Sequence, residues 1–454
     1  MSDRLSLHLR RTLILGLPLV GSQLAQILIG LTDTLMLGRY SVAALAASTL
    51  STSFFFAMFV LGSGFAVACM PMAAIALARD DEVRVRRIAR MGLWLSLVTG
   101  LAMAPLMIFS EPILLALGQR ASVAADAQSY LRVAGFGMIP ALLTATFRSH
   151  LSALERTRIV LVATLVAAGL NIALNWLLIF GNLGFPEMGL RGAALASVAV
   201  HVLTTLVLAL YATRGPDMAR FDLLRNIHRP DWPAFGEIFR LGWPIGLTHL
   251  SESGLFTGSA LMMGWLGTVP LAAHGVAIQI AALTFMVHLG LSSAATVRVG
   301  RAWGMGDAGA LRRAAIAAGL LSGIVVALSL VMYLGFGEWI VSNFIDPTDP
   351  DAAAILTLGT HLLVLAALFQ LVDAGQVMAL GFLRGVQDTR RPMIYAIVSY
   401  WVLGIPASYL LGFPLGLGPD GIWLGLVVGL AAATVALMTR FVRITRPDLA
   451  TSRS

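Results

Sequence analysis

Long apolar stretches recur along the whole chain, and they constrain its fold more than any other feature. About 20 apolar residues in a helix cross the hydrocarbon core of a bilayer. Only 12% of the residues are charged, whereas a soluble domain has about 25%. The pattern predicts an all-α integral membrane protein with twelve transmembrane helices. The predicted spans are residues 12–38, 43–78, 91–110, 128–151, 159–180, 190–212, 238–264, 270–302, 314–336, 354–382, 393–413 and 420–441.

The basic residues are all arginines, and most of them fall in alternate loops. Arginine-rich loops stay on the cytoplasmic side of a membrane, so their spacing predicts that both termini are cytoplasmic. This topology also accounts for the net charge of +8, and we expect no nucleic-acid partner. The loops that carry the charge contain Arg79, Arg84, Arg86, Arg87 and Arg90, then Arg156 and Arg158, Arg214 to Arg240, Arg312 and Arg313, and Arg384, Arg390 and Arg391.

The two halves of the chain repeat each other at one constant shift, without a gap over the first spans of each half. LGLP at 15–18 superposes on LGWP at 241–244, and LMLG at 35–38 on LMMG at 261–264. The same shift places Asp81 on Asp307. Six spans in each half insert the same way up, which predicts two pseudo-symmetric six-helix lobes with substrate near the midplane. We assign residues 1–213 to the first lobe (TM1–TM6), 214–240 to a cytoplasmic linker and 241–454 to the second lobe (TM7–TM12).

Three acidic residues, Asp33, Glu252 and Asp373, lie alone inside apolar spans. A carboxylate at the bilayer centre costs about 2.5–3.5 kcal/mol on insertion scales and usually has a function. Counted from the flanking arginines at 1.5 Å per residue, Glu252 and Asp373 lie about 16–18 Å from the cytoplasmic face. Both belong to the second lobe and could share a cavity that binds Na⁺ or a proton. The alternative is a pair that is neutralised or held protonated for packing.

Asp33 belongs to the first lobe and lies nearer the outer face, where it could instead be merely interfacial. Asn171 and Asn175 are four residues apart and therefore share one face of a helix. They could complete a polar site with Asp33, or they could join helices, as polar side chains in bilayers commonly do.

Energy-coupling motifs help to narrow the class of transporter. The phosphate-binding motif GxxxxGK[ST] requires a lysine, and the chain contains none. Transport would therefore draw on an ion gradient or on a partner. We expect no enzyme activity and no cofactor besides the coupling ion, H⁺ or Na⁺.

Several segments resemble transporters of the multidrug and toxic compound extrusion (MATE) family, most of all its bacterial NorM-type branch. The similar segments span most of the chain in order: GLTDTLMLG at 30–38, LNIALNW at 170–176, AAHGVAIQ at 272–279, VRVGRAWGMGD at 297–307, VDAGQV at 372–377, LRGVQDTRRP at 383–392 and SYWVLGIP at 399–406. The resemblance implies a two-lobe fold that exports cationic or amphipathic drugs in exchange for Na⁺ or H⁺. It also implies coupling roles for Asp33, Glu252 and Asp373, with Asn171 and Asn175 beside the first-lobe acid.

The sequence departs from the family at Phe369, where relatives often carry a tyrosine that contacts the cation. A phenyl ring neither donates nor accepts hydrogen bonds, which favours H⁺ over Na⁺ or a differently held Na⁺. We therefore predict a secondary multidrug antiporter of the bacterial inner membrane, monomeric and surrounded by lipid. The alternatives are a lipid-linked precursor flippase, a membrane-embedded lipid-carrier enzyme and a channel.

Overall fold

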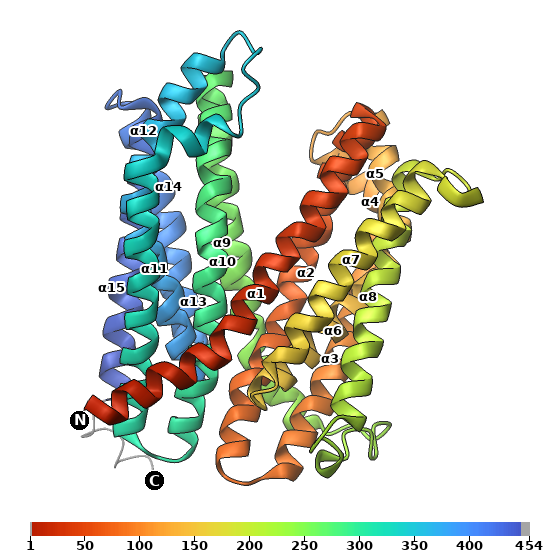
Figure 1. The fold of residues 1–454 in the computed structure, drawn as a ribbon, viewed down its shortest axis with the longest axis vertical. Helices are drawn as coiled ribbons and strands as arrows, with labels where there is room; N and C mark the ends of the chain where they lie inside the picture. The colour runs from red at the N-terminus through yellow and green to blue at the C-terminus, as the bar shows by residue number, and fades with distance from the viewer. Residues whose placement is uncertain (1, 446–454) are drawn as a thin grey trace. The chain divides into compact units, whose positions relative to one another are not determined.

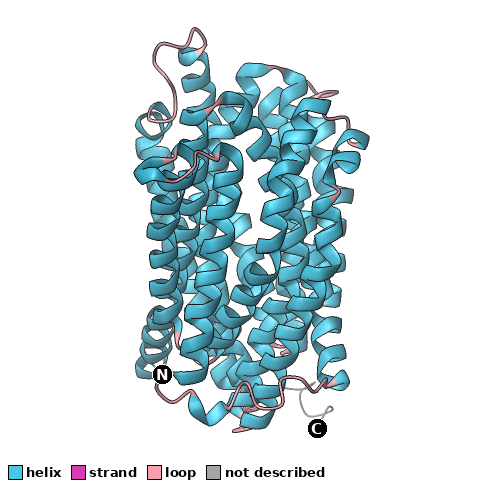
Figure 2. Ribbon diagram, turned by 90° about the vertical axis from the view of Figure 1, so that its right-hand side faces the viewer, coloured by secondary structure: helices cyan, strands magenta, loops and turns pink. Residues whose placement is uncertain are grey.

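The computed structural model describes residues 2–445, and within that range the chain consists of helices and short loops (Figures 1 and 2). The α-helices are α1 (Ser2–Tyr40), α2 (Val42–Ala78), α3 (Glu82–Ile108), α4 (Ser110–Ala116), α5 (Ala121–Ala134), α6 (Met138–Ala153), α7 (Thr157–Phe180), α8 (Gly189–Arg214), α9 (Trp232–Leu266), α10 (Thr268–Gly304), α11 (Ala308–Ser342), α12 (Ala352–Gly385), α13 (Arg390–Ile397), α14 (Ile405–Gly412) and α15 (Gly418–Ile444).

Each of the twelve predicted spans corresponds to one helix or to one nearly continuous run of helices. The fourth span is α5 and α6, joined by a 3₁₀ turn, and the eleventh is α13 and α14, joined by the π-helical segment Val398–Gly404. Within the described residues, eleven of these spans are long and apolar enough to cross a membrane. The remaining one is α9, a helix of 35 residues whose membrane-depth portion includes His249 and Glu252. Polar side chains thus concentrate in the helix that carries one of the predicted coupling acids.

Close contacts divide the chain into two units, and α1 and α9 each contribute to both. One unit is the described part of Met1–Val20 and Leu247–Ser454, and the other is Gly21–Gly246. The two divisions, after Val20 and after Gly246, fall at positions that the sequence repeat superposes. The two units are defined by which residues lie close to one another. The lobe and linker boundaries were assigned from the sequence instead and stay a prediction: 1–213, 214–240 and 241–454.

Close helix packing explains where these divisions fall. A Cβ added to Gly64 of α2 would lie 2.4 Å from the carbonyl oxygen of Gly242, ten residues after the first residue of α9. Gly290 of α10 is the equivalent position in the second half, and a Cβ added there would lie 2.7 Å from the Cα of Val20 in α1. Small residues let helix backbones approach this closely in membranes. The first part of α1 therefore packs on α10, and the first part of α9 packs on α2.

Helix starts also repeat between the two halves. Asp81 accepts a hydrogen bond from the backbone N–H of Arg84 at 2.8 Å and caps α3. Asp307 does the same for Ala310 at 2.7 Å and caps α11. An Asp at this position satisfies one of the backbone donors that a helix start leaves free. The repeat seen in sequence is therefore a repeat of local structure.

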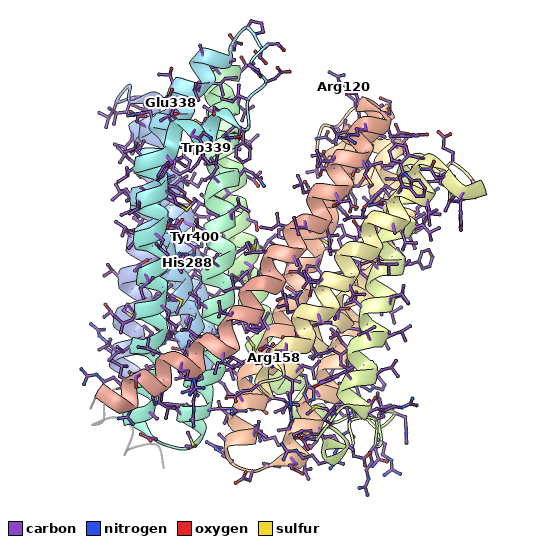
Figure 3. All side chains as sticks on the ribbon, in the orientation of Figure 1. Arg120, Arg158, His288, Glu338, Trp339 and Tyr400 are labelled. Carbon is purple, nitrogen blue, oxygen red and sulfur yellow. The ribbon has the colours of Figure 1, made fainter. Side chains whose placement is uncertain are left out.

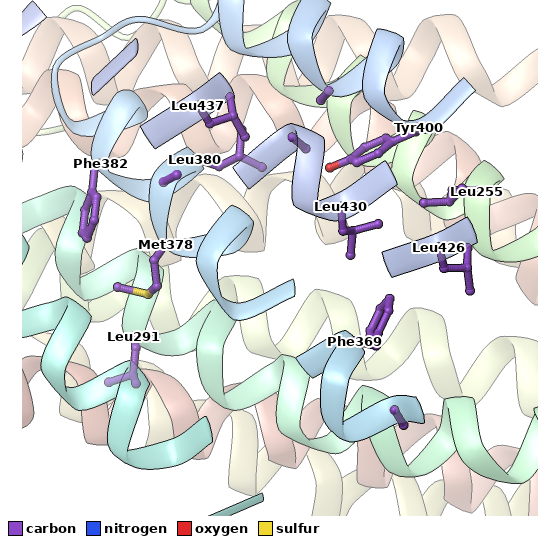
Figure 4. Packing of buried hydrophobic residues seen from close by; sticks show 14 of the residues in the cluster. Leu255, Leu291, Phe369, Met378, Leu380, Phe382, Tyr400, Leu426, Leu430 and Leu437 are labelled. Atoms are coloured by element: carbon purple, nitrogen blue, oxygen red, sulfur yellow. The ribbon is translucent and has the colours of Figure 1, made fainter. Parts of the chain in front are cut away.

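The unit that contains α10 to α15 is built around a large apolar core. Leu255, Leu426 and Leu430 lie in it together with Phe369 and Tyr400 (Figure 4). In this unit α1 begins and α15 ends at the same end (Figure 1). A chain that begins and ends on one side of a membrane crosses it an even number of times, which fits this arrangement.

Outside the bilayer spans, arginines of α3 form ion pairs with acids near the start of α9. Arg87 forms an ion pair with Asp231, and Arg84 with Glu237 at 2.8 Å. The hydrogen bond from the Arg87 guanidinium holds the pKa of Asp231 below its usual value. The exposed pair of Arg84 and Glu237 stabilises the fold by at most about 1 kcal/mol.

Replacing Gly425 by Ala tests the close approach of α14 and α15. A Cβ at Gly425 would lie 2.1 Å from the backbone nitrogen of Ser408, whereas a Cβ at Gly319 of α11 would meet nothing within 4 Å. We expect Gly425→Ala to destabilise the protein by about 1–3 kcal/mol. Gly319→Ala should be neutral or stabilising, since Ala exceeds Gly in helix propensity by about 1 kcal/mol. Thermal unfolding in detergent measures both, and equal midpoints would contradict the packing described here.

Candidate ion and substrate sites

Glu252 lies at one end of a buried hydrogen-bond chain that joins three helical segments. The Gln376 amide of α12 donates to Glu252 Oε1, and its carbonyl oxygen accepts from the Tyr400 hydroxyl. Glu252 is 6% exposed, and the other two side chains are fully buried. A buried carboxylate needs donors of this kind to offset its lost hydration. Gln376 is therefore the residue that links Glu252 to the π-helical segment.

Asp373 lies one helical turn before Gln376 on the same face of α12. It is 1% exposed, and in residues 2–445 neither carboxylate oxygen has a hydrogen-bond partner. Asp373 is also close enough to Glu252 for the two charges to interact. The structure thus brings together the two acids that the sequence placed at one depth. Their functional roles stay a prediction.

A histidine and an arginine approach Glu252 from its other side. Arg384 Nη2 donates to His249 Nε2 at 3.0 Å, and His249 Nδ1 lies 3.8 Å from Glu252 Oε2. Because Nε2 accepts this hydrogen bond, a neutral His249 carries its proton on Nδ1, facing the carboxylate. The placement of Arg384 in a loop was wrong: it lies in the last turn of α12 and is 7% exposed. Its buried position lets it reach His249.

Phe369, at the position where the family resemblance implies a tyrosine, packs in an aromatic cluster. Its ring centroid lies 6.0 Å from that of Phe256 and 5.7 Å from that of Trp423, both in edge-to-face geometry. The side chain is 2% exposed. Four residues before Asp373, the side chain of Phe369 is therefore apolar and offers no oxygen ligand to a cation, whereas Gln370, three residues before Asp373, is a fully buried amide whose oxygen accepts from Thr284. Among the described residues, no three or more His, Cys, Asp or Glu side chains are grouped closely enough to hold a metal ion.

The π-helical segment Val398–Gly404 presents two aromatic side chains to this site. Tyr400 donates to Gln376, and Trp401 Nε1 donates to Ser251 Oγ of α9 at 2.8 Å. Tyr400 lies inside the helix bundle, whereas Glu338 and Trp339 lie near the end of α11 (Figure 3). A π-bulge changes the direction in which successive side chains point and often occurs at functional sites. In the sequence, the motif SYWVLGIP was the signal that drew attention to this segment, and it did not predict the π-helix.

A second polar site lies in the unit formed by Gly21–Gly246. Asn171 and Asn175 of α7 both donate to Asp33 Oδ1, the former at 3.0 Å. Asn175 also donates to Asn171 Oδ1 at 3.2 Å, and both asparagines are fully buried. The predicted grouping of these three residues is therefore present. Two neutral donors on one oxygen offset part of the hydration that the Asp33 carboxyl group loses on burial.

Asp33 lines a cavity of about 200 Å³ within this unit. Its walls come from α1, α2, α5, α6, α7 and α8. Both polar and apolar side chains face it, among them Gln26, Ile29, Asp33, Tyr130, Arg148 and His201. Apolar walls with a few placed polar groups are typical of small-molecule sites. No sequence pattern predicted a functional role for Arg148, because an arginine near the end of a predicted span is common in membrane proteins.

Comparison with known proteins places this architecture in a family. The family model of MatE matches residues 18–177 and 244–410. The chain belongs to the MatE family. The two matched segments begin at positions that the sequence repeat superposes, and each covers the first five spans of one half. The chain thus has the predicted all-α fold of twelve helices in two pseudo-symmetric lobes.

Relatives and solved structures resemble the chain over nearly its full length. It is 46% identical over 439 residues to a protein of Rhizobium meliloti (strain 1021) named "Probable multidrug resistance protein NorM", covering 97% of this chain and 94% of the relative. A protein of the same name from Agrobacterium fabrum is 41% identical, with 98% and 96% covered. A crystal structure of MATE in complex with MaL6 superposes with a TM-score of 0.89 at 21% identity, over 98% of this chain and 97% of that chain. The eukaryotic MATE transporter AtDTX14 gives 0.85 at 19% identity, with 99% and 98% covered.

These matches confirm the family predicted from the motifs. The protein is a multi-pass membrane transporter and not an enzyme, which removes the lipid-carrier enzyme from the alternatives. A MatE transporter needs no cofactor.

Replacing Gln376 by Leu tests the hydrogen-bond chain at Glu252. The substitution leaves a buried carboxylate without its amide donor, which costs about 1–3 kcal/mol or more. Tyr400→Phe removes only the hydroxyl donor to Gln376 and should cost about 1 kcal/mol. We expect the thermal midpoint to fall further for Gln376→Leu than for Tyr400→Phe. Ser342→Ala, at an exposed hydroxyl on α11, serves as the control. The reverse order would show that the amide does not support Glu252.

Proposed function

We propose that this transporter is a secondary antiporter that exports cationic or amphipathic compounds in exchange for H⁺ or Na⁺. The observation that carries the proposal is Asp373: a buried acid with no hydrogen-bond partner among the described residues, one turn from the amide that binds Glu252. A carboxylate in this setting gains most from an incoming cation. An ion and a cationic drug that compete for these acids would couple their two flows.

The surroundings of Asp373 favour a proton over Na⁺ as the coupling ion. Hard cations need several oxygen ligands, whereas a proton needs only the carboxylate. Phe369, at the position where the family resemblance implies a tyrosine, supplies a phenyl ring packed on Phe256 and Trp423. We therefore expect a pH gradient to drive efflux more strongly than a Na⁺ gradient does.

The proposal includes the membrane in which the protein lies and the side of it that the two termini face. The named relatives are bacterial, and arginines gather in alternate loops, which supports an inner-membrane protein with cytoplasmic termini. The last residues of the chain, 446–454, lie outside the described residues. One charge that moves across 100 mV releases about 2.3 kcal/mol, which supports a tens-fold drug gradient. We further propose that it works as a monomer in contact with lipid.

The flippase alternative differs in the charge that its cavity must offer. A lipid pyrophosphate needs several cationic groups, whereas the coupling region in the α10–α15 unit carries Glu252 and Asp373 with one nearby arginine. The NorM relatives bear multidrug-resistance names, which supports drug export over lipid transfer.

Efflux from proteoliposomes tests the coupling role of the two acids. Ethidium efflux is followed with an imposed pH gradient or an imposed Na⁺ gradient, one at a time. We expect Asp373→Asn and Glu252→Gln each to lower the initial gradient-driven rate about tenfold or more, a change of about 1.4 kcal/mol per decade. Asp33→Asn should have a smaller effect on coupling. Glu338→Gln, an exposed acid at the end of α11, is the matched control.

Two results would contradict the proposal. In the first, Asp373→Asn and Glu252→Gln both retain full ion-driven efflux. In the second, neither gradient drives efflux by the unmodified protein. A Na⁺ gradient that works without any pH gradient would overturn the preference for protons but not the antiport.

A further inference from the structure

A second chain of buried hydrogen bonds ends three residues before Asp373. Gln370 of α12 is fully buried, and its carbonyl oxygen accepts from the Thr284 hydroxyl of α10 at 2.9 Å. Thr284 Oγ1 lies 2.8 Å from the hydroxyl of Tyr333 of α11, which is 1% exposed. Because a threonine hydroxyl has one proton and two lone pairs, Tyr333 can donate to Thr284 while Thr284 donates to Gln370. Hydroxyl groups from two helices thus hold one amide group of a third helix by its oxygen.

The nitrogen of the same amide group has no hydrogen-bond partner among the described residues. Both carboxylate oxygens of Asp373 also lack one there. An unpaired donor and an unpaired acceptor are each costly in a buried site. Residues three apart on a helix have Cβ atoms about 5–6 Å apart, a spacing at which Gln and Asp side chains can form a hydrogen bond. The free donor of Gln370 and the free acceptors of Asp373 are therefore within reach of each other.

This arrangement parallels the one that supports Glu252. There, the Tyr400 hydroxyl donates to the carbonyl oxygen of Gln376, and the amide nitrogen donates to the acid. At Gln370 a hydroxyl group again occupies the carbonyl oxygen and leaves the nitrogen for an acid. The two glutamines lie three residues before and three residues after Asp373 on α12. Each acid of the pair thus has an amide group within reach that is held by a hydroxyl group.

We propose that Gln370 is a positioning residue that donates a hydrogen bond to the ionised carboxylate of Asp373, with Thr284 and Tyr333 holding its amide group in the donating orientation. A donor to the charged form of an acid favours that form. Gln370 therefore eases the release of a bound proton, which is the step that frees Asp373 for a cationic compound. The inference rests on the coupling role proposed for Asp373 and adds the groups that adjust it.

Other titratable groups around Asp373 keep their identity when Gln370 is changed, so a shift in its titration reports on the amide. By element, these groups are Glu252 and His249 on α9, Tyr333 on α11, Arg384 on α12 and Tyr400 on the π-helical segment. Both α10 and α15 contribute hydroxyl groups to this part of α12, those of Thr284 and Thr434. The two histidines of α10 have hydrogen-bond partners elsewhere, His274 with Ser259 and His288 with Ser322.

Infrared difference spectroscopy of the purified full-length protein tests the inference. The C=O stretch of protonated carboxyl groups is followed as the pH is raised, and the band that Asp373→Asn removes is assigned to Asp373. Gln370→Met keeps the length of the side chain and removes the amide group. We expect the midpoint of this band to move to higher pH by about one to two units. That shift is a 10- to 100-fold rise in proton affinity, as expected when an ionised group loses one hydrogen bond.

Two further variants separate a specific role from a structural one. Thr284→Val keeps the shape of the side chain and the amide of Gln370 but no longer holds that amide by its oxygen. It should move the midpoint in the same direction by less, and it carries the test if Gln370→Met is poorly folded. Gln128→Met makes the matched change at a buried glutamine of α5 whose amide donates to Glu111 at 2.9 Å. This control should leave the Asp373 band where it is.

The inference is overturned if the folded variants leave the midpoint unchanged or if the Asp373 band does not titrate. A lower midpoint overturns it as well. Thr284 Oγ1 also lies 2.8 Å from the carbonyl oxygen of Ala281, and a hydroxyl that donates there would leave the Gln370 oxygen to accept from protonated Asp373. Ion-driven efflux by the unmodified protein is measured separately. A raised midpoint without efflux would keep the role of Gln370 and remove the antiporter, and efflux with an unchanged midpoint would do the opposite.

Discussion

The absence of water from the bilayer core is the constraint on which the rest of this structure depends. Every backbone polar group at that depth must pair within the protein, so the spans are helical. Every polar side chain there needs a protein partner for the same reason. The two amides that bind Asp33 and the amide that binds Glu252 are neutral donors, which solvate a carboxylate without cancelling its charge. Such acids remain able to attract a cation.

Of the three acids, Asp373 is the one whose carboxylate oxygens have no hydrogen-bond partner among the described residues. On α12, Phe369 and Gln370 lie one turn before it and Gln376 lies one turn after it, and Gln376 is hydrogen-bonded to Glu252 and Tyr400. The site therefore holds two acids, and the hydrogen bond from the Gln376 amide goes to Glu252 rather than to Asp373. An incoming ion would relieve this shortage, and its departure would restore it. That difference between loaded and empty states is what an antiporter needs in order to link two flows.

The duplicated halves share a scaffold and differ in their chemistry. Glycines at 64 and 290, caps at 81 and 307, and the starts of α2 and α10 all superpose at the one shift of the repeat. At the same shift Glu252 corresponds to Gln26, which lines the cavity near Asp33, and Asp33 corresponds to Ser259. Packing positions are the same in both halves because both must close helices against each other. Charged positions are free to diverge, which allowed one half to specialise in a paired-acid site and the other in a cavity of mixed charge.

Local patterns in the sequence determined the spans, the repeat, the isolated acids and the shared face of Asn171 and Asn175, because hydropathy and helical period act over a few turns. The tertiary structure alone decided which side chains meet. Gln376 reaches Glu252 from 124 residues away, and Tyr400 reaches Gln376 only through the π-helical segment. In the sequence, Arg148 and Arg384 lie at or near the ends of predicted spans, where arginines are common. In the structure, Arg148 lines the cavity that contains Asp33, and Arg384 is hydrogen-bonded to His249. Such meetings depend on how each helix is rotated and how closely it packs, and contacts summed over the whole fold set both quantities.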